Sequence, residues 1–219
     1  MLSKIQRIFG IGLNYRDHAA EMGKPIPSYP DVFIRPLSSI LPVGQPLVLP
    51  PNSSKVDYEA ELGVLIGSSG KFISPENALT YVAGYCLACD VSVRDFQGHG
   101  SQWTAGKMFD GTLPLGPIVS ADKISDPQAL DIELLINGET LQKSNTSQMI
   151  FSVAQIIAYL SECLTLQPGD LIITGTPAGV GVGRKPPRYL KAGDVIITQL
   201  QGLGALTVPV LAASTLAKK

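Results

Sequence analysis

Two glutamates stand two positions apart in the segment Lys55 to Ile66, where apolar and acidic residues alternate. Alternation with a period of two predicts a β-strand. On such a strand, Glu59 and Glu61 emerge from the same face, with their backbone positions roughly 6 to 7 Å apart. Two like charges this close favour a cation between them, and carboxylate oxygens suit Mg²⁺, Mn²⁺ or Ca²⁺. The other interpretation is a solvated acidic face of the strand.

A third carboxylate, Asp90, lies in the apolar run Tyr85 to Val93, where we expect it to be buried. A buried charge requires a partner, because its transfer out of water is costly. One possible partner is a metal ion shared with the two glutamates. The other is Arg94, four residues further along the chain, in a plain internal ion pair.

His18 and Glu21 are three residues apart, which places them on one face if residues 15 to 22 form a helix. The carboxylate would orient the imidazole and stabilise its charged form, and such a pair can take a proton from water as a general base. The alternative is an ordinary surface pair at a helix end. The only other histidine, His99, stands between two glycines, where we expect a solvated loop.

A glycine-rich segment follows a predicted strand at residues 170 to 183. A dinucleotide-binding or phosphate-binding loop would have to open a helix, and the second type also requires Gly-Lys followed by Ser or Thr. Arg184, Lys185 and two prolines follow instead, so these nucleotide sites are excluded. The glycine backbone could still present N–H groups, together with Thr176, to an anionic substrate.

The elements that would position these residues are mostly strands. The clearest helix covers residues 152 to 163 and begins with a capping box of Ser152 and Gln155. Shorter helices are expected over residues 15 to 22 and after Ser74-Pro75, and Asn137-Gly138 is a signal for a tight hairpin turn. Many strands without a regular βαβ alternation predict an α+β fold dominated by β-structure, in a single domain of residues 1 to 219. The predicted strands cover residues 55–66, 81–93, 113–119, 130–136, 170–174, 194–200 and 204–211.

The composition excludes several classes of partner. The 219 residues include 17 Lys and Arg against 18 Asp and Glu, so no strong field attracts nucleic acid or an anionic membrane. No apolar run approaches the length of a membrane span, and the N-terminal apolar stretch is too short for a secretory signal. Three cysteines are an odd number, which favours free thiols in a reducing compartment. We therefore expect a cytoplasmic protein that binds neither nucleic acid nor membranes.

Several motifs, in this order along the chain, resemble the fumarylacetoacetate hydrolase superfamily and are nearest to its short acylpyruvase-like members. The resemblance covers nearly the whole chain. The matching motifs are Gly12-Leu13-Asn14-Tyr15 with His18 and Glu21, Phe33-Ile34-Arg35-Pro36, Asp57-Tyr58-Glu59-Ala60-Glu61-Leu62, Asp90 through Gln97, Trp103 through Asp110, and Thr174-Gly175-Thr176-Pro177.

The resemblance implies a homodimer with a rolled, mixed β-sheet core, and it gives the candidate residues their roles. It assigns the Mg²⁺ or Mn²⁺ ligands to Glu59, Glu61 and Asp90. It assigns the activation of water to His18 and Glu21, and the sharing of developing negative charge to Lys107. The residues that it assigns to substrate binding are Asn14, Tyr15, Arg35, Arg94, Gln97 and Thr176.

The activity implied is hydrolysis of a carbon–carbon bond in a small β-diketo acid. Acylpyruvates such as fumarylpyruvate or acetylpyruvate would give pyruvate and a carboxylic acid. The same metal chemistry without activated water would decarboxylate or tautomerise oxaloacetate, or catalyse an isomerisation of the 2-hydroxymuconate type, and the fold does not decide between them. An inactive ligand-binding protein is the alternative from another class, but it leaves the metal triad and the His18 pair unexplained.

Overall fold

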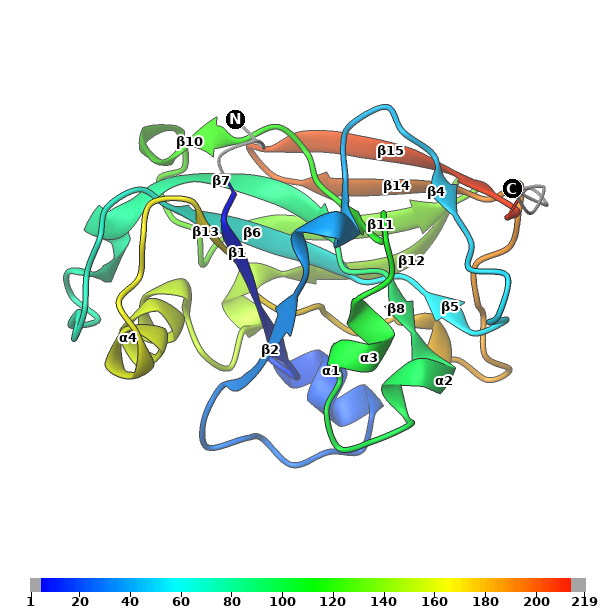
Figure 1. Cartoon of the computed structure of the whole chain (residues 1–219), viewed down its shortest axis with the longest axis horizontal. Coiled ribbons are helices and arrows are strands. Elements are labelled where there is room, and N and C mark those ends of the chain that lie inside the picture. The colour runs from blue at the N-terminus through cyan, green and yellow to red at the C-terminus, as the bar shows by residue number, and fades with distance from the viewer. Residues whose placement is uncertain (1–4, 214–219) are drawn as a thin grey trace.

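The computed structural model describes residues 5–213, and two β-sheets form its frame (Figure 1). The larger sheet has six strands in the order β10-β7-β6-β13-β1-β2, and the second has five in the order β12-β11-β14-β15-β4. Parallel pairs such as β1 with β13 occur beside antiparallel ones such as β1 with β2, so the sheets are mixed. The predicted α+β fold dominated by β-structure is confirmed.

The strands of the six-stranded sheet are β1 (Arg7–Gly12), β2 (Asp31–Arg35), β6 (Ala60–Ile66), β7 (Val82–Cys89), β10 (Val119–Ser120) and β13 (Asp170–Ile173). Those of the five-stranded sheet are β4 (Leu47–Val48), β11 (Asp131–Ile136), β12 (Glu139–Asn145), β14 (Val195–Leu200) and β15 (Gly204–Leu211). Two small pairs are formed by β3 (Ile40–Leu41) with β9 (Leu113–Pro114) and by β5 (Val56–Asp57) with β8 (Ser92–Val93). The α-helices are α1 (Arg16–Glu21), α2 (Arg94–Gln97), α3 (Thr104–Lys107) and α4 (Val153–Cys163).

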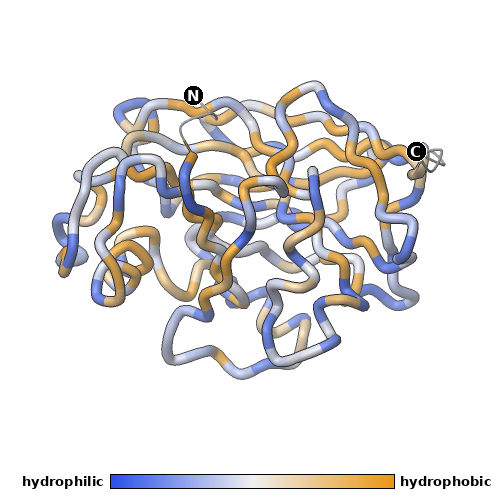
Figure 2. The backbone as a smooth tube through the Cα atoms, in the orientation of Figure 1, coloured by the Kyte–Doolittle hydropathy of each residue, from blue (hydrophilic) through white to orange (hydrophobic). Residues whose placement is uncertain are grey.

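The six-stranded sheet is buried on both of its faces. Alternate residues of a strand point to opposite faces, and in β6 Leu62 and Val64 join one cluster of buried apolar side chains whereas Leu65 joins another. The first cluster also contains apolar residues of the five-stranded sheet and of α4. In Figure 2 the apolar stretches follow the strands and α4, whereas the hydrophilic stretches gather in the peripheral loops. The central strands therefore form a rigid frame for the residues at their ends.

Helix α4 and the hairpin turn after β11 agree with the predictions from the sequence. Ser152 and Gln155 form the predicted capping box at its start. Asn137 and Gly138 join β11 to β12 with positive φ angles of 54° and 84°, the combination that a tight type I′ hairpin turn requires. No described helix has the length and apolarity of a membrane span.

Other predicted elements were wrong in their bounds. The segment predicted after Ser74-Pro75 forms only a 3₁₀ turn at Ala78–Tyr81. The predicted strand over residues 113 to 119 is two separate short strands, β9 and β10. Strands β1 and β2 were not predicted, since β1 contains two glycines and β2 follows a loop rich in proline.

The two longest predicted strands, residues 55 to 66 and 81 to 93, are each interrupted at the same level. The first breaks at Tyr58 and Glu59, between β5 and β6, and the second breaks at Asp90 and Val91, between β7 and β8. The breaks lie opposite each other, because the backbone N–H of Asp90 donates to the carbonyl of Glu59 at 2.8 Å. Glu59 thus lies in an irregular backbone segment and not on a regular strand face. The alternation of acidic residues does not mark a solvated face, because Asp57, Glu59 and Glu61 are all buried.

Two glycines of β1 lie directly under aromatic rings. A Cβ atom on Gly10 would stand 2.1 Å from the Phe33 ring, and one on Gly12 would stand 1.7 Å from the Trp103 ring. The two rings also contact each other, with centroids 6.2 Å apart. The backbone of β1 therefore forms a seat for both rings.

Asn14 joins three segments that are distant in the sequence. Its Nδ2 donates to the carbonyls of Phe151 at 3.0 Å and Thr174 at 2.8 Å, and its Oδ1 accepts the Phe151 N–H at 2.8 Å. All three hydrogen bonds of the buried amide are made to the backbone. A structural role therefore explains why Asn14 stands in the sequence motif.

We expect Asn14→Ala to lower the free energy of unfolding by about 2 to 4 kcal/mol, because buried backbone groups at Phe151 and Thr174 lose their partners. Urea denaturation measures this change. Asn52→Ala is the matched control, since Asn52 is exposed and a surface substitution of this kind shifts stability by less than about 0.5 kcal/mol. Equal stabilities of the two variants would contradict the structural role of Asn14.

Candidate active site

Three buried carboxylates converge where the long strands are interrupted. Glu59 and Asp90 lie in the two breaks, and Glu61 lies on β6, two residues further along. One carboxylate oxygen of each residue lies within 4.8 Å of those of the other two. The sequence prediction that these three side chains meet is thus matched by the geometry.

Three cations bind this carboxylate group from three different elements. Lys107, at the end of α3, places Nζ 2.6 Å from Glu59 and also binds Asp90. Arg94, at the start of α2, binds Glu59 at 2.6 Å. Arg35, at the end of β2, binds Asp90. The alternative interpretation, a plain ion pair of Asp90 with Arg94, is therefore wrong, because Arg94 binds Glu59 whereas Arg35 and Lys107 bind Asp90.

Arg94 also binds Asp57, at 2.8 Å, and this fourth carboxylate holds the glycine-rich loop. Asp57 accepts the N–H groups of Gly181 at 2.7 Å and Val182 at 2.9 Å. A Cβ atom on Gly181 would lie 2.5 Å from the Asp57 carboxylate, so this close approach needs glycine. Arg94 consequently links the triad to the loop predicted to bind an anion.

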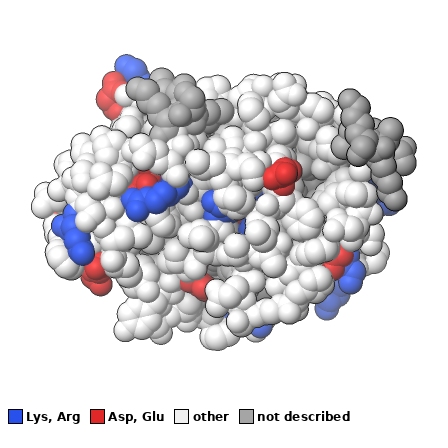
Figure 3. Space-filling model, viewed as in Figure 1, with Lys and Arg blue, Asp and Glu red and all other residues white. Residues whose placement is uncertain are grey.

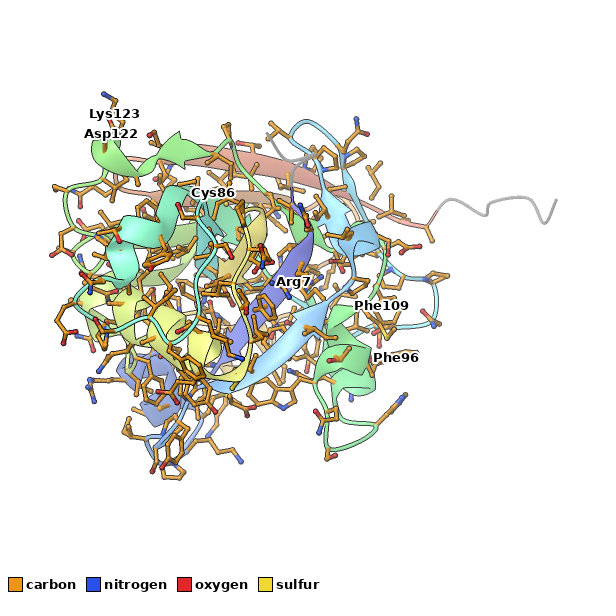
Figure 4. The ribbon with its side chains drawn as sticks, turned by 60° about the vertical axis from the view of Figure 1, so that its left-hand side comes forward. Arg7, Cys86, Phe96, Phe109, Asp122 and Lys123 are labelled. Atoms are coloured by element: carbon orange, nitrogen blue, oxygen red, sulfur yellow. The ribbon has the colours of Figure 1, made fainter. Side chains whose placement is uncertain are left out.

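The short helices that carry Arg94 and Lys107 are held together by aromatic packing. Phe96 of α2 and Phe109, just after α3, meet edge to face with centroids 5.0 Å apart, and Figure 4 shows the two rings side by side. Lys107 itself lies over the Phe33 ring, 5.1 Å from its centroid. These contacts orient two of the three cations toward the carboxylates.

The site carries one net negative charge. Four carboxylates, Asp57, Glu59, Glu61 and Asp90, face three cations, Arg35, Arg94 and Lys107. This internal concentration of charge contrasts with the outer face in Figure 3, where charged side chains are few and scattered.

The excess negative charge falls on Glu61. It forms no ion pair among the described residues and accepts the N–H of Gly175 at 2.7 Å. Burial, and then the negative charges of Asp90 and Glu59, raise the pKa of Glu61 well above its ordinary value. Burial would raise the pKa of Glu59 as well, but Arg94 and Lys107 outweigh it and lower that pKa to about 2. The electrostatic environment of Glu61 therefore favours either a proton or a metal cation.

A divalent cation fits these residues. The donor set consists of oxygen atoms only, as Mg²⁺ and Mn²⁺ prefer, and includes a buried carboxylate that no side-chain cation neutralises. Burial would lower the pKa of Lys107, but Asp90 and Glu59 raise it, so the lysine stays protonated beside the triad. The residues that could hold the metal are Glu59, Glu61 and Asp90.

The His18 pair lies at the same site and is not a surface pair. In α1, Nδ1 of His18 lies 2.9 Å from Glu21, whose other oxygen accepts the N–H of Gly179 at 2.9 Å. Asp17 also holds the helix by accepting a hydrogen bond from Ser144 at 2.6 Å. The imidazole is nearly buried, and its Nε2 remains for a reacting molecule.

These groups surround a cavity of about 530 Å³, a typical size for a small-molecule site. The predicted site residues that line it are His18, Glu59, Glu61, Asp90, Arg94, Gln97, Lys107 and Thr176. Thr176 accepts a hydrogen bond from Gln142 at 2.8 Å, and Gln97 accepts one from Arg94 at 3.0 Å, so both are oriented. The lining residues that the sequence did not identify as site residues include Met22, Lys24, Pro27, Asp31 and Val182. Most of them lie in irregular segments, where no periodic pattern marks the face of a side chain, and Asp31 begins β2, a strand that was not predicted.

Four predicted site residues do not line the cavity. Glu21 binds the His18 imidazole, and the Asn14 side chain is committed to the backbone, as described above. Tyr15 is completely buried, and its hydroxyl has no hydrogen-bond partner among the described residues. Arg35 is buried with its guanidinium on Asp90 and, at 2.7 Å, on Thr112. Its position offers orientation of Asp90 and not direct substrate contact.

The remaining reactive side chains lie elsewhere. Cys86 and Cys89 are buried, free, and have pKa values raised to about 12 by burial, so both are inert thiols (Figure 4 labels Cys86). His99 is exposed and packs against the Phe96 ring, with centroids 4.8 Å apart.

Residues 7–211 match the family described as Fumarylacetoacetate (FAA) hydrolase C-terminal. The chain belongs to the fumarylacetoacetate hydrolase family. A protein of Burkholderia multivorans is 50% identical over 206 residues, which are 93% of this chain and 73% of its own length; its name specifies no substrate.

Solved structures of family members have the same fold. The fumarylpyruvate hydrolase of Pseudomonas aeruginosa, solved in complex with Mn²⁺ and pyruvate, is 36% identical with a TM-score of 0.88, over 95% of this chain and 90% of that one. The 2-hydroxyhepta-2,4-diene-1,7-dioate isomerase of Mycobacterium marinum is 36% identical with a TM-score of 0.85, over 96% of this chain and 76% of that one. The family thus includes proteins named for different reactions.

We expect Glu61→Gln to stabilise the metal-free protein while weakening its binding of Mn²⁺. Because the folded-state pKa of Glu61 is raised, the folded metal-free protein keeps a proton that the unfolded chain releases, so its stability falls as pH rises above the ordinary carboxyl value. The amide has no proton to release, and its advantage should grow from near zero below about pH 4 to about 1 to 3 kcal/mol at neutral pH.

Urea denaturation in the presence of a chelator measures the stability, and calorimetric titration with Mn²⁺ measures the affinity, which should fall at least about tenfold. Glu162→Gln on the exposed side of α4 is the control and should change neither quantity. A destabilised Glu61→Gln protein with unchanged Mn²⁺ affinity would contradict the role of Glu61.

Proposed function

We propose that this chain is a Mg²⁺- or Mn²⁺-dependent hydrolase that cleaves the carbon–carbon bond of small β-diketo acids. Acylpyruvates such as fumarylpyruvate or acetylpyruvate would yield pyruvate and a carboxylic acid. The observation that carries the proposal is that the carboxylate triad and the His18 imidazole line the same cavity. A metal site and a base for water, on either side of one substrate, are the two requirements of this hydrolysis.

The substrate's own carboxylate would be held by the glycine-rich loop. Thr176 lines the cavity, and its hydroxyl is oriented by Gln142. Gln97 and Arg94 line the cavity beside it, although Arg94 is already engaged by Glu59 and Asp57. These polar groups would fix the keto-acid end of the substrate beside the triad.

When bound by Glu59, Glu61 and Asp90, a divalent cation supplies a Lewis acid that polarises the keto oxygen next to the substrate carboxylate. His18 takes a proton from water at Nε2, and Glu21 at Nδ1 stabilises the imidazolium that results. The resulting hydroxide adds to the distal carbonyl. The bond between that carbonyl carbon and the methylene then breaks, with its electron pair leaving on the pyruvate fragment as an enolate.

Lys107 is placed to lower the energy of that enolate. Its ammonium stays charged because two carboxylates raise its pKa above the ordinary value. A positive charge fixed in a buried site stabilises developing negative charge more than the same charge in water. The enolate is finally protonated at carbon, and the imidazolium returns the proton that His18 removed.

A second candidate function is isomerisation of a 2-hydroxymuconate-type diacid, or decarboxylation or tautomerisation of oxaloacetate. The observation that favours isomerisation is that several of the similar solved proteins are named as isomerases. These reactions use the triad and Lys107 without an activated water. The ordered pair of His18 and Glu21 supports hydrolysis instead.

We further propose a homodimer, as the resemblance implies, and a cytoplasmic location, which the odd number of cysteines favours.

We expect purified protein with Mn²⁺ or Mg²⁺ to consume acylpyruvates, followed by their ultraviolet absorbance, and to lose this activity in chelator. Loss of oxaloacetate alone would favour decarboxylation or tautomerisation. Inertness toward every keto acid with either metal would contradict the proposal and favour a ligand-binding protein.

We expect His18→Ala to lower kcat for acylpyruvate hydrolysis by about 10²- to 10⁴-fold, the contribution of a general base. Glu21→Gln should lose less, and the double variant should be hardly slower than His18→Ala, because residues of one catalytic unit are non-additive. Any decarboxylation of oxaloacetate should survive, since it needs no activated water. Additive losses, or equal losses of both activities, would contradict this division of roles.

A further inference from the structure

The cavity also has an apolar wall. Its members come from β1, the end of α1, the following loop, β2, the start of α3 and the glycine-rich loop, and they are Ile11, Leu13, Met22, Pro27, Phe33, Trp103 and Val182. Phe33 and Trp103 are fixed in place by the glycine seat on β1. The wall suits the carbon chain of a substrate and offers nothing to a charge.

One cation of the cavity lining is not engaged with the triad. Arg94 and Lys107 each bind carboxylates, whereas Lys24 lines the cavity and forms no ion pair with any residue between 5 and 213. Its side chain is exposed, as expected at the mouth of the cavity.

The position of Lys24 is set by the helix that carries His18. Gly23 ends this helix with a φ of 61°, a left-handed conformation that glycine adopts at no steric cost. The chain then turns back, and the N–H of Lys24 donates to the carbonyl of Ala19 at 2.9 Å. The base for water and the free ammonium therefore belong to one anchored unit.

We propose that Lys24 binds a second carboxylate at the far end of the substrate, so that keto diacids are preferred over keto monoacids. This inference rests on the proposed function, because it requires the keto-acid end to lie at the triad. The carbon chain then follows the apolar wall, and its terminal carboxylate reaches the mouth of the cavity. An uncharged acyl tail would gain contacts with the apolar wall but no ion pair with the Lys24 ammonium.

Asp31 limits the strength of this preference. It also lines the cavity, is exposed, and forms no ion pair among residues 5 to 213. Its negative charge repels a terminal carboxylate and competes for Lys24. The two residues together predict opposite effects of their substitution on the binding of a diacid.

The test uses 2-oxohexanedioate and 2-oxohexanoate, six-carbon keto acids that differ in one terminal carboxylate. Neither has the second keto group that the proposed hydrolysis cleaves, so their binding to the Mn²⁺-loaded protein can be measured by calorimetric titration. We expect the diacid to bind about two- to five-fold more tightly, the range for an exposed ion pair. The difference should shrink at high salt.

Substitutions then test whether the Lys24 ammonium causes this preference. Lys24→Met should remove the preference without changing monoacid affinity, Lys24→Arg should retain it, and Asp31→Asn should increase it. Lys71→Met is the matched control and should have no effect, because Lys71 lies over the Phe72 ring and does not line the cavity.

Equal affinities for the two acids in the unsubstituted protein, a preference that survives Lys24→Met, or failure of both acids to bind would overturn the inference. Hydrolysis of acylpyruvates is measured separately. Hydrolysis without a diacid preference would remove the role of Lys24 and leave the proposed function intact. A Lys24-dependent preference without any hydrolysis would remove the proposed function and leave the diacid site intact.

Discussion

The structure depends on the mutual neutralisation of charges that are buried together. Glu59, Asp90 and Asp57 each bind a guanidinium or an ammonium that comes from a different element. A buried charge without its partner is far costlier than the loss of an ordinary contact. The cluster therefore forces β2, α2 and α3 to meet the central strands in one arrangement. Among residues 5–213, Glu61 of this cluster has no such partner, so the same arrangement that fixes the fold leaves a place for a cation.

The sheets form a rigid frame, and the irregular segments carry most of the side chains of the site. Strands β6 and β7 are covered on both faces, so they cannot yield when charged groups are placed at their ends. Glu59 and Asp90 lie where the strands are interrupted, and the pair of His18 and Glu21 lies on α1, a helix of six residues. That helix is held by Ser144 of β12 and by Gly179 of the glycine-rich loop. The active groups are thus local departures from regular structure, each supported by a strand.

The sequence predicted the fold class, the capped helix α4 and the hairpin at Asn137-Gly138, because these follow from periodicity and local chemistry. The meeting of Glu59, Glu61 and Asp90 was assigned by the family resemblance, since the pattern alone also allowed a solvated face and a plain ion pair. The sequence did not predict that the strands break at Glu59 and Asp90, since each break is stabilised by contacts from distant segments. The partner of Asp90 was missed for the same reason. Arg35 is 55 residues away in sequence, and nothing local distinguishes it from a substrate-binding arginine.

Gly10 and Gly12 of β1 limit how the pocket can be reshaped by laboratory evolution for other substrates. The glycine backbone of β1 lies beneath Phe33 and Trp103, with no side chain between it and the rings. The depth of the pocket at these two residues is therefore determined by the rings alone. Libraries that vary the rings can enlarge the pocket down to the backbone. Libraries that vary Gly10 or Gly12 can only make it shallower, because any side chain there pushes a ring toward the substrate.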